Sequence, residues 1–155
     1  MLTEVYLGLG SNLGDRAGNI ARGIELLQAN ATIVAVSSLH DTGAQDFETQ
    51  PSFLNAACRL WTCLDPFQLM ARLVEIEASV GRGHAFPNAP RTLDLDILIY
   101  GAVIVEMPGL SIPHPRMVQR EFVLLPLAEI APELRHPVLK RSVASLLAVL
   151  ACKVR

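Results

Sequence analysis

Lysine is nearly absent from this chain of 155 residues, in which Lys140 and Lys153 are the only two. Arginine supplies most of the 13 basic residues, and 15 acidic residues leave a formal net charge of −2. A domain that binds duplex nucleic acid usually carries a basic stripe or a strongly basic composition. Because neither is present, we expect no nucleic-acid partner. Arginine does suit bidentate capture of phosphate oxygens.

Long apolar runs are also missing, although 51% of the residues are hydrophobic. A membrane-spanning helix needs about 20 mostly apolar residues in a row. The richest stretches, Asp96–Met107 and Phe122–Leu127, are shorter or interrupted. The start of the chain lacks the basic residues and apolar run of a signal peptide. We therefore expect a cytoplasmic protein without a membrane partner.

The chain contains no internal repeat, low-complexity run or linker. We expect residues 1–155 to form a single domain that acts as a monomer, since this length can bury one sizeable core without disulfides. The three cysteines are odd in number and lack C-x-x-C spacing, so they are expected to be reduced thiols rather than a disulfide framework: Cys58, Cys63 and Cys152.

Alternating and helical periodicities predict a strand–helix–strand–strand–helix–strand order over the first hundred residues. The predicted strands are Glu4–Leu9, Thr32–Leu39, Ser52–Thr62 and Leu93–Tyr100, and the helices begin at Asp15 and Asp65. Gln68 is expected to complete a capping box with Asp65, and Gly81 to end that helix. In the third strand, one side should carry Leu54, Ala56, Cys58 and Leu60, and the other Phe53, Asn55, Ala57 and Arg59.

The order of these elements is typical of a ferredoxin-like α+β sandwich, an antiparallel sheet with helices on one face. The other face is then open to a ligand. Further helices are predicted over Glu121–Ala131 and Val143–Leu150.

The connections between these elements contain glycine and proline. Gly8, Gly10 and Gly14 surround Ser11 and Asn12, which predicts a turn after the first strand. Segments 40–51 and 83–90 are expected to be loops, and loops of such length are often functional.

Asp94 and Asp96 are the strongest candidates for metal ligands. On a strand, residues two apart share a face and lie about 7 Å apart. Mg²⁺ is commonly bound by one or two carboxylates together with substrate phosphates. The alternative is a polar strand face that looks at solvent, which is the commoner meaning of an isolated D-x-D. The apolar neighbours Leu93, Leu95, Ile97 and Ile99 favour the metal site, because they place the pair opposite a core-facing row.

Four arginines border the aspartate strand in the sequence: Arg82, Arg91, Arg116 and Arg120. Arginine forks match phosphate oxygens and neutralise charge in phosphoryl transfer. His114, between two prolines, can donate to a phosphate or serve only as a turn residue. Solvated surface arginines are the alternative interpretation.

Phe53 and Phe122 are candidates for a pair of rings around a flat heterocycle, with Asn55 hydrogen-bonding its edge. Core aromatics are the alternative for either ring.

Six segments together resemble the 6-hydroxymethyl-7,8-dihydropterin pyrophosphokinase family of folate synthesis. They cover nearly the whole chain in the family's order: 8–16 (GLGSNLGDR), 53–56 (FLNA), 81–82 (GR), 90–98 (PRTLDLDIL), 113–116 (PHPR) and 126–132 (PLAEIAP).

The resemblance implies transfer of pyrophosphate from ATP to the hydroxymethyl group of a reduced pterin, with release of AMP. It also implies that Asp94 and Asp96 hold two Mg²⁺ ions with ATP. The phosphate contacts carried over are Arg82, Arg91, His114 and Arg120, with Arg82 and Arg91 also catalytic and Glu77 at the nucleotide site. The pterin contacts carried over are Thr42, Phe53, Asn55 and Phe122.

The loop before the aspartate strand departs from the family pattern. His84 stands where a second arginine is usual, and Asn88 stands where the family has tryptophan. Gly43 replaces a frequent proline. These differences leave open a divergent paralogue that acts on a related pterin. A separate alternative is a non-catalytic module that binds a pterin or nucleotide.

Overall fold

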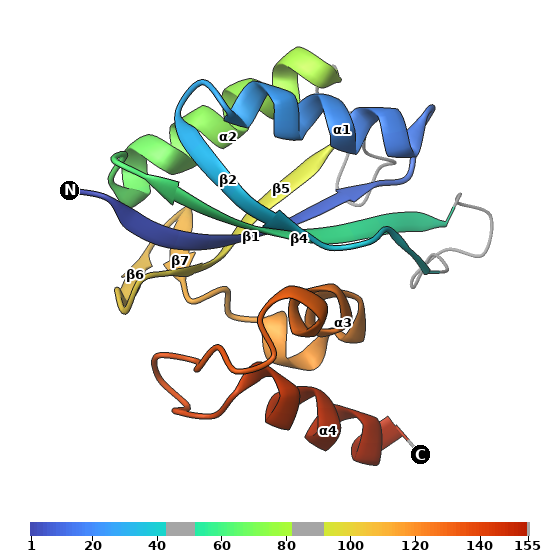
Figure 1. Cartoon of the computed structure of the whole chain (residues 1–155), viewed down its shortest axis with the longest axis vertical. Coiled ribbons are helices and arrows are strands. Elements are labelled where there is room, and N and C mark those ends of the chain that lie inside the picture. Colours follow the sequence, from blue (N-terminus) through green and yellow to red (C-terminus); the bar gives the residue numbers. More distant parts are fainter. Residues whose placement is uncertain (43–51, 82–91, 155) are drawn as a thin grey trace.

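The computed structural model describes residues 1–42, 52–81 and 92–154 and shows helices on both faces of a sheet (Figure 1). Helices α1 (Arg16–Leu27) and α2 (Pro66–Val80) lie on one face. Helix α3 (Glu121–Ile130) lies on the other face, and α4 (Val143–Val154) packs against α3, farther from the sheet. The strands are β1 (Thr3–Ser11), β2 (Ala31–Val36), β3 (His40–Thr42), β4 (Phe53–Thr62), β5 (Asp94–Tyr100), β6 (Val105–Met107) and β7 (Leu110–Ile112). A 3₁₀ turn covers Met117–Gln119.

The main sheet is antiparallel and its strands follow the order β2-β4-β1-β5, with β3 pairing with β4 beyond the end of β2. Strands β6 and β7 form a separate hairpin. The predicted ferredoxin-like order is therefore confirmed. The prediction was wrong at the end of the second strand, which stops at Val36, and His40–Thr42 forms β3 rather than the start of a loop.

Local signals fix the two helices of the first layer. The Asp15 side chain accepts from the Gly18 N–H at 3.1 Å and caps α1. Asp65 and Gln68 form a reciprocal capping box at the start of α2, with hydrogen bonds of 2.8 and 2.9 Å. Each cap is worth about 1 kcal/mol of stability. Sequence therefore predicted both starts correctly.

Gly81 ends α2, as expected, but for a different reason from the usual left-handed cap. Its backbone is extended, with φ −140° and ψ 164°. A side chain here would place Cβ 2.3 Å from the Cβ of Thr92, so only glycine fits. Gly81 and Thr92 thus lie against each other.

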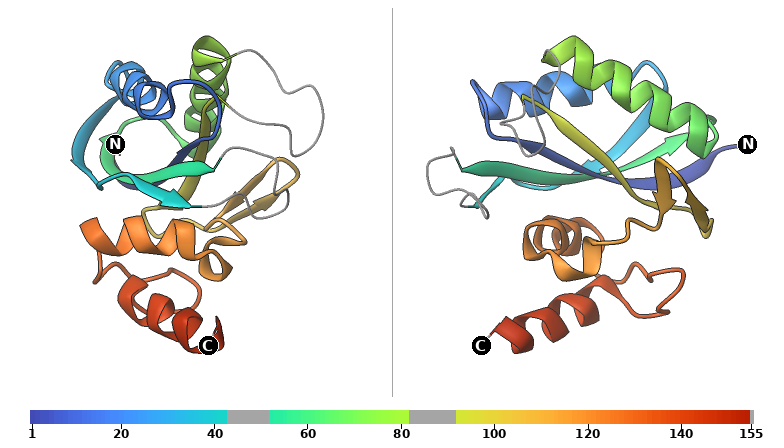
Figure 2. Two further views of the ribbon diagram at one scale, coloured as in Figure 1. Left: turned by 90° about the vertical axis from the view of Figure 1, so that its right-hand side faces the viewer. Right: turned by 180° about the vertical axis from the view of Figure 1, so that it is seen from behind.

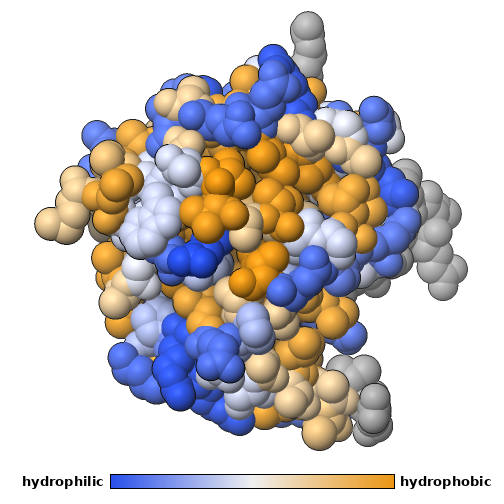
Figure 3. Space-filling model, viewed as in Figure 1, coloured by the Kyte–Doolittle hydropathy of each residue, from blue (hydrophilic) through white to orange (hydrophobic). Residues whose placement is uncertain are grey.

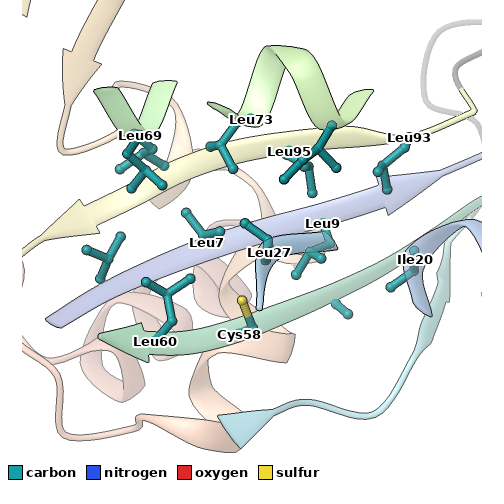
Figure 4. Packing of buried hydrophobic residues seen from close by; sticks show 14 of the residues in the cluster. Leu7, Leu9, Ile20, Leu27, Cys58, Leu60, Leu69, Leu73, Leu93 and Leu95 are labelled. Carbon is teal, nitrogen blue, oxygen red and sulfur yellow. The ribbon is translucent and has the colours of Figure 1, made fainter. Parts of the chain in front are cut away.

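The larger core lies between the sheet and α1 and α2 (Figure 4). Alternate residues of β4 point into it, as predicted: Leu54, Ala56, Cys58 and Leu60. Leu69, Leu73 and Ile76 of α2 meet them, and Ile20 and Leu27 of α1 complete the packing. Burial of this apolar surface is the main term that stabilises the domain.

A bulge in β5 overturns one predicted strand face. Tyr6 pairs with Ile99 and Leu7 pairs with Ile97, which leaves Leu98 as an extra residue. Leu98 and Ile99 both pack toward α3 and α4, whereas Ile97 packs toward α1 and α2. Ile99 was predicted to share the face of Leu95 and Ile97. The alternating pattern could not show the extra residue.

The second sheet face was expected to be open, and this was wrong. A second core cluster fills the space between the sheet and α3 and α4: Tyr6, Ala57, Leu98, Ile99, Met117, Leu124, Leu127, Val143 and Leu146. Figure 2 shows α3 lying directly beneath the sheet in both views. On β5, Asp94 and Asp96 are half-buried while Leu98 and Ile99 are buried. On this face of β5, the partly exposed side chains thus lie at the Asp94 end of the strand.

The surface mixes residue types, and Figure 3 shows apolar residues gathered between polar ones over the middle of one face. In the part of the chain that the structure describes, none of the helices has the length and apolarity to cross a membrane.

Candidate functional site

Three neighbouring strands bring the predicted site residues to one end of the sheet. Strand β1 runs in the middle, with β4 on one side and β5 on the other. Gly10 of β1 lies opposite Asn55 of β4 and opposite Asp94 of β5, and Gly8 lies opposite Asp96. Since paired residues share a face, all of these positions look to the α3 side.

The two glycines make the floor of this site. The first strand was predicted to end at Leu9, before a turn at Ser11 and Asn12, but β1 continues through Gly10 to Ser11. A Cβ on Gly10 would lie 3.1 Å from Oδ1 of Asn55 and 3.6 Å from the ring of Phe53. Glycines two apart in a strand leave one face bare. That spacing was the signal in the sequence that the turn prediction missed.

Asp94 and Asp96, the aspartate pair, project from β5 beside this floor, as predicted. Both are half-buried. The carboxylate of Glu77, in the last turn of α2, accepts the Leu95 N–H at 2.7 Å. Glu77 therefore secures the strand between the two aspartates.

The donor set suits a hard cation that is completed by other oxygen ligands. Among residues 1–42, 52–81 and 92–154, no group of three or more His, Cys, Asp or Glu side chains is placed to hold a metal. Two carboxylates on one strand face match Mg²⁺, which keeps several waters and is commonly bound together with substrate phosphates. The residues present therefore fit Mg²⁺ as a partner of a phosphate ligand.

Thr42, Phe53 and Asn55, the Asn55 cluster, lie on the other side of the glycine floor. Asn55 is buried, and its Nδ2 donates to Oγ1 of Thr42 at 2.9 Å. Thr42 and Phe53 face each other in the β3–β4 ladder. This bond fixes the orientation of the Asn55 amide, whose carbonyl oxygen lies against Gly10.

Helix α3 packs over β4 and brings Phe122 to the same side of the sheet as Phe53. Phe122 is half-buried, and the Arg120 guanidinium carbon lies 5.5 Å from the centre of its ring. A cation over an aromatic face is attracted by the ring quadrupole. The predicted ring pair therefore comes from β4 and α3.

His114 is close enough to Asp94, Arg116 and Arg120 to interact electrostatically with all three. Its backbone N–H donates to the Leu98 carbonyl at 2.9 Å, and its ring Nδ1 accepts the backbone N–H of Arg116 at 3.1 Å. A ring nitrogen that accepts carries no proton, which assigns the proton to Nε2. Burial lowers the pKa of His114 below 6.5, Arg120 and Arg116 lower it further, and Asp94 opposes the shift. His114 is thus a neutral donor near neutral pH.

The structure brings together most of the predicted site: Thr42, Phe53, Asn55, Glu77, Asp94, Asp96, His114, Arg120 and Phe122. Arg82 and Arg91, predicted as catalytic phosphate contacts, lie outside the described residues, as do Gly43, His84 and Asn88. Gly81 and Thr92, next to those two arginines in the chain, are in contact at the end of α2.

A family model described as 7,8-dihydro-6-hydroxymethylpterin-pyrophosphokinase matches residues 6–132. A 2-amino-4-hydroxy-6-hydroxymethyldihydropteridine pyrophosphokinase of Aquifex aeolicus is 38% identical over 140 residues, which cover 90% of this chain and 88% of that protein.

The folic acid synthesis protein FOL1 of Dictyostelium discoideum is 42% identical over 135 residues, or 87% of this chain. The chain spans only 20% of that protein's length. Among solved structures, the Plasmodium falciparum HPPK-DHPS has a TM-score of 0.80 at 16% identity, over 99% of this chain and 46% of that one. This likeness supports the ferredoxin-like fold alone.

Proposed function

The chain belongs to the 7,8-dihydro-6-hydroxymethylpterin-pyrophosphokinase family, and we propose that it transfers pyrophosphate from ATP to the hydroxymethyl group of 6-hydroxymethyl-7,8-dihydropterin. In this reaction the hydroxyl oxygen forms a bond to the β-phosphorus of ATP. The bond between that phosphorus and the oxygen bridging to the α-phosphorus breaks. AMP leaves, and the hydroxyl proton is lost to solvent.

The observation that carries the proposal is the placement of the Asn55 cluster and the aspartate pair on either side of Gly10. A heterocycle read by Asn55 and a phosphate chain held at Asp94 would meet over a floor without side chains. The absence of bulk there permits close approach of the two reacting groups. Holding both substrates in line supplies much of the acceleration in phosphoryl transfer.

Asp94 and Asp96 would hold Mg²⁺, and two ions are proposed with ATP. Bound Mg²⁺ withdraws charge from the phosphate oxygens and so favours attack on phosphorus. Glu77 keeps the strand between its two ligands in place through Leu95. Its role at the nucleotide site is therefore to support the aspartate pair.

His114 and Arg120 would also bind the phosphate chain. His114 donates from Nε2 in its neutral form, so its contact needs no protonation near neutral pH. Arg120 lies over the Phe122 ring, which limits where its guanidinium can reach. Arg82 and Arg91 are proposed as further phosphate contacts and as catalytic groups that stabilise the transferring phosphates.

Thr42, Phe53, Asn55 and Phe122 would bind the pterin. Phe53 and Phe122 would stack on its two faces, and Asn55 would hydrogen-bond its edge. The hydrogen bond from Asn55 to Thr42 supports this role, because it leaves the Asn55 amide in one orientation. We further propose that the acting unit is a single-domain monomer in the cytoplasm. Sedimentation of the purified protein tests the monomer.

The reaction is tested by incubating the purified chain with ATP, Mg²⁺ and the reduced pterin, and by separating the nucleotides. We expect AMP and the pterin diphosphate in equal amounts. Formation of ADP would instead indicate transfer of a single phosphoryl group. Pterin binding without any AMP would favour the non-catalytic module, and faster turnover of another 6-substituted pterin would favour the divergent paralogue.

A further inference from the structure

We propose that Arg16 is a positioning residue for the Asn55 cluster, which it holds from the opposite face of the sheet. The proposal rests on the pterin role of that cluster given above. Arg16 opens α1, and its guanidinium bridges two segments that are distant in sequence. Nη1 donates to the carbonyl oxygen and to Oγ of Ser52, both at 2.9 Å. Nη2 donates to Oδ2 of Asp41 at 3.1 Å.

The two segments that Arg16 joins lead directly into the site. Asp41 precedes Thr42 at the end of β3, and Ser52 precedes Phe53 at the start of β4. Thr42 is paired with Phe53, and Asp41 is paired with Leu54. Arg16 therefore ties together the strand ends that carry both Thr42 and Phe53.

Arg16 acts from behind the sheet. Side chains alternate along a strand, so Asp41 and its partner Leu54 share one face while Thr42 and Phe53 share the other. Leu54 belongs to the core beneath α1 and α2. Arg16 is on that side, and a bound heterocycle is on the other. It is a positioning residue and does not touch the substrate.

The start of α1 provides a fixed base for the Arg16 side chain. Asp15 caps the helix through Gly18 at 3.1 Å. Asn19 donates from Nδ2 to the Leu13 carbonyl at 2.8 Å and to Oγ of Ser11 at 3.3 Å. The end of β1 and the start of α1 are thereby joined. This local structure accounts for the Gly14-Asp15-Arg16 end of the motif, which the proposed reaction does not use.

The chemistry of the bridge favours arginine. A guanidinium presents several donors in a rigid plane, so it can serve a carboxylate and a backbone carbonyl at once. Hydrogen bonds from Arg16 and from Ser52 lower the pKa of Asp41, which keeps its carboxylate charged. Lysine would keep the charge but offers no planar fork.

The consequence for the site is geometric. Strand β3 has only three residues, and Asn55 depends on one of them, Thr42, for its 2.9 Å hydrogen bond. Without the Arg16 bridge, the Thr42 end of β3 would be held against β4 by the ladder and by the Thr42 hydroxyl, which donates to the Phe53 carbonyl at 3.4 Å and accepts from Asn55. A shift there would move Thr42 and turn the Asn55 amide, while the aspartate pair on β5 would stay in place.

The test compares Arg16→Met with Arg22→Met. Arg22 is on the same helix and makes an exposed ion pair with Glu25 at 2.9 Å, so it is a matched control for loss of one surface arginine. We expect Arg16→Met to raise the KM for the pterin about tenfold, since small misplacements near a reacting centre have large effects. The KM for ATP and the melting temperature should stay near those of the unchanged protein. Arg22→Met should change none of these.

Arg16→Lys keeps the positive charge and tests whether the planar guanidinium with its several donors is required. We expect a pterin KM between those of the unchanged protein and Arg16→Met. Asp41→Asn should weaken pterin binding less than Arg16→Met does. Combining the two substitutions should weaken binding little more than Arg16→Met alone, because both disrupt the same bridge.

An unchanged pterin KM in both Arg16 variants would overturn the proposal. The proposal would also be overturned if the KM for ATP rose as much as the KM for the pterin and the melting temperature fell. Arg16 would then contribute only to the stability of the fold. Calorimetry with the pterin alone separates this inference from the reaction. Suppose that the unchanged protein binds the pterin in calorimetry but releases no AMP in the assay with ATP and Mg²⁺, and that Arg16→Met binds the pterin more weakly. The pyrophosphokinase proposal then fails and the role of Arg16 stands.

Discussion

Asn55 and Asp94 lie opposite the same residue, Gly10, from the two strands that flank β1. Neighbouring strands are about 4.8 Å apart, so the backbones of these two residues are separated by about 10 Å. Gly10 contributes no side chain to the space between them. The candidate pterin and metal positions are therefore set by the register of three strands.

Gly10→Ala should damage pterin binding more than folding. The new Cβ would lie 3.1 Å from Oδ1 of Asn55 and 3.6 Å from Phe53, so the Asn55 cluster must shift. We expect the KM for the pterin to rise several-fold, measured by steady-state kinetics at saturating ATP. Gly8→Ala is the matched control, because the nearest atoms to its Cβ belong to Leu98 at 3.4 Å or more. Equal effects of the two substitutions would contradict the account.

Thr42→Val should disturb the Asn55 amide. It removes the oxygen that accepts from Asn55 Nδ2 at 2.9 Å and leaves a buried donor without this partner. Losing a partner for a buried donor costs about 1–3 kcal/mol. We expect weaker pterin binding in calorimetry and a lower free energy of unfolding. Thr42→Ser keeps the hydroxyl and should bind the pterin like the unchanged protein. Pterin binding by Thr42→Val as tight as that of the unchanged protein would contradict the role given to the hydrogen bond.

Glu77→Ala should act on the nucleotide side of the site. The Leu95 N–H would lose its acceptor at 2.7 Å, and the strand between Asp94 and Asp96 would be held less firmly. We expect a several-fold rise in the KM for Mg²⁺-ATP with little change in the KM for the pterin. Glu77→Gln retains an oxygen acceptor and should recover most of the loss. A pterin-specific defect would be inconsistent with the role assigned to Glu77.

The sequence was sufficient where the signal is local. Asp65 and Gln68 are three residues apart, and their capping box formed as the pattern predicted. Alternation along β4 also placed Asn55 and Cys58 on opposite faces correctly. Asp94 and Asp96 share the predicted face because residues two apart in a regular strand point to the same side.

The sequence was insufficient where contacts join distant segments. Arg16 meets Ser52 across 36 residues, and no periodicity indicates such a pair. The extra residue Leu98 reverses the face of Ile99, since one inserted residue changes the alternation of a strand. Helices α3 and α4 were predicted, but their position over the sheet depends on tertiary packing against Tyr6 and Leu98.

Glu129 links α3 to the segment before β3, and its titration should be visible in stability. Its carboxylate accepts from the N–H and Oγ of Ser38, both at 2.6 Å, and contacts Nε2 of His40 at 3.0 Å. These bonds to Ser38, with His40, lower the pKa of Glu129 from 4.5 to about 2. A lowered carboxyl pKa stabilises the fold above the unfolded value, and this contribution is lost as the pH falls through the folded value.

We therefore expect the unfolding free energy of the unchanged protein to decline as the pH falls from about 4.5 toward 2. Glu129→Gln should reduce this slope, measured by denaturant titration at a series of pH values. Glu25→Gln, which removes one member of an exposed helix pair, is the control and should leave the slope nearly unchanged. Equal slopes in Glu129→Gln and the unchanged protein would show that the bonds to Ser38 do not carry the linkage.

The proposed metal-binding role of the aspartate pair is tested by the rate at which Asp94→Asn releases AMP. The substitution keeps the size of a half-buried side chain and removes one carboxylate proposed to hold Mg²⁺. Loss of metal stabilisation worth several kcal/mol predicts a fall in the AMP-release rate on the order of a hundredfold or more. The circular dichroism spectrum should be unchanged. A folded Asp94→Asn protein that releases AMP at close to the original rate would contradict the assignment of this site.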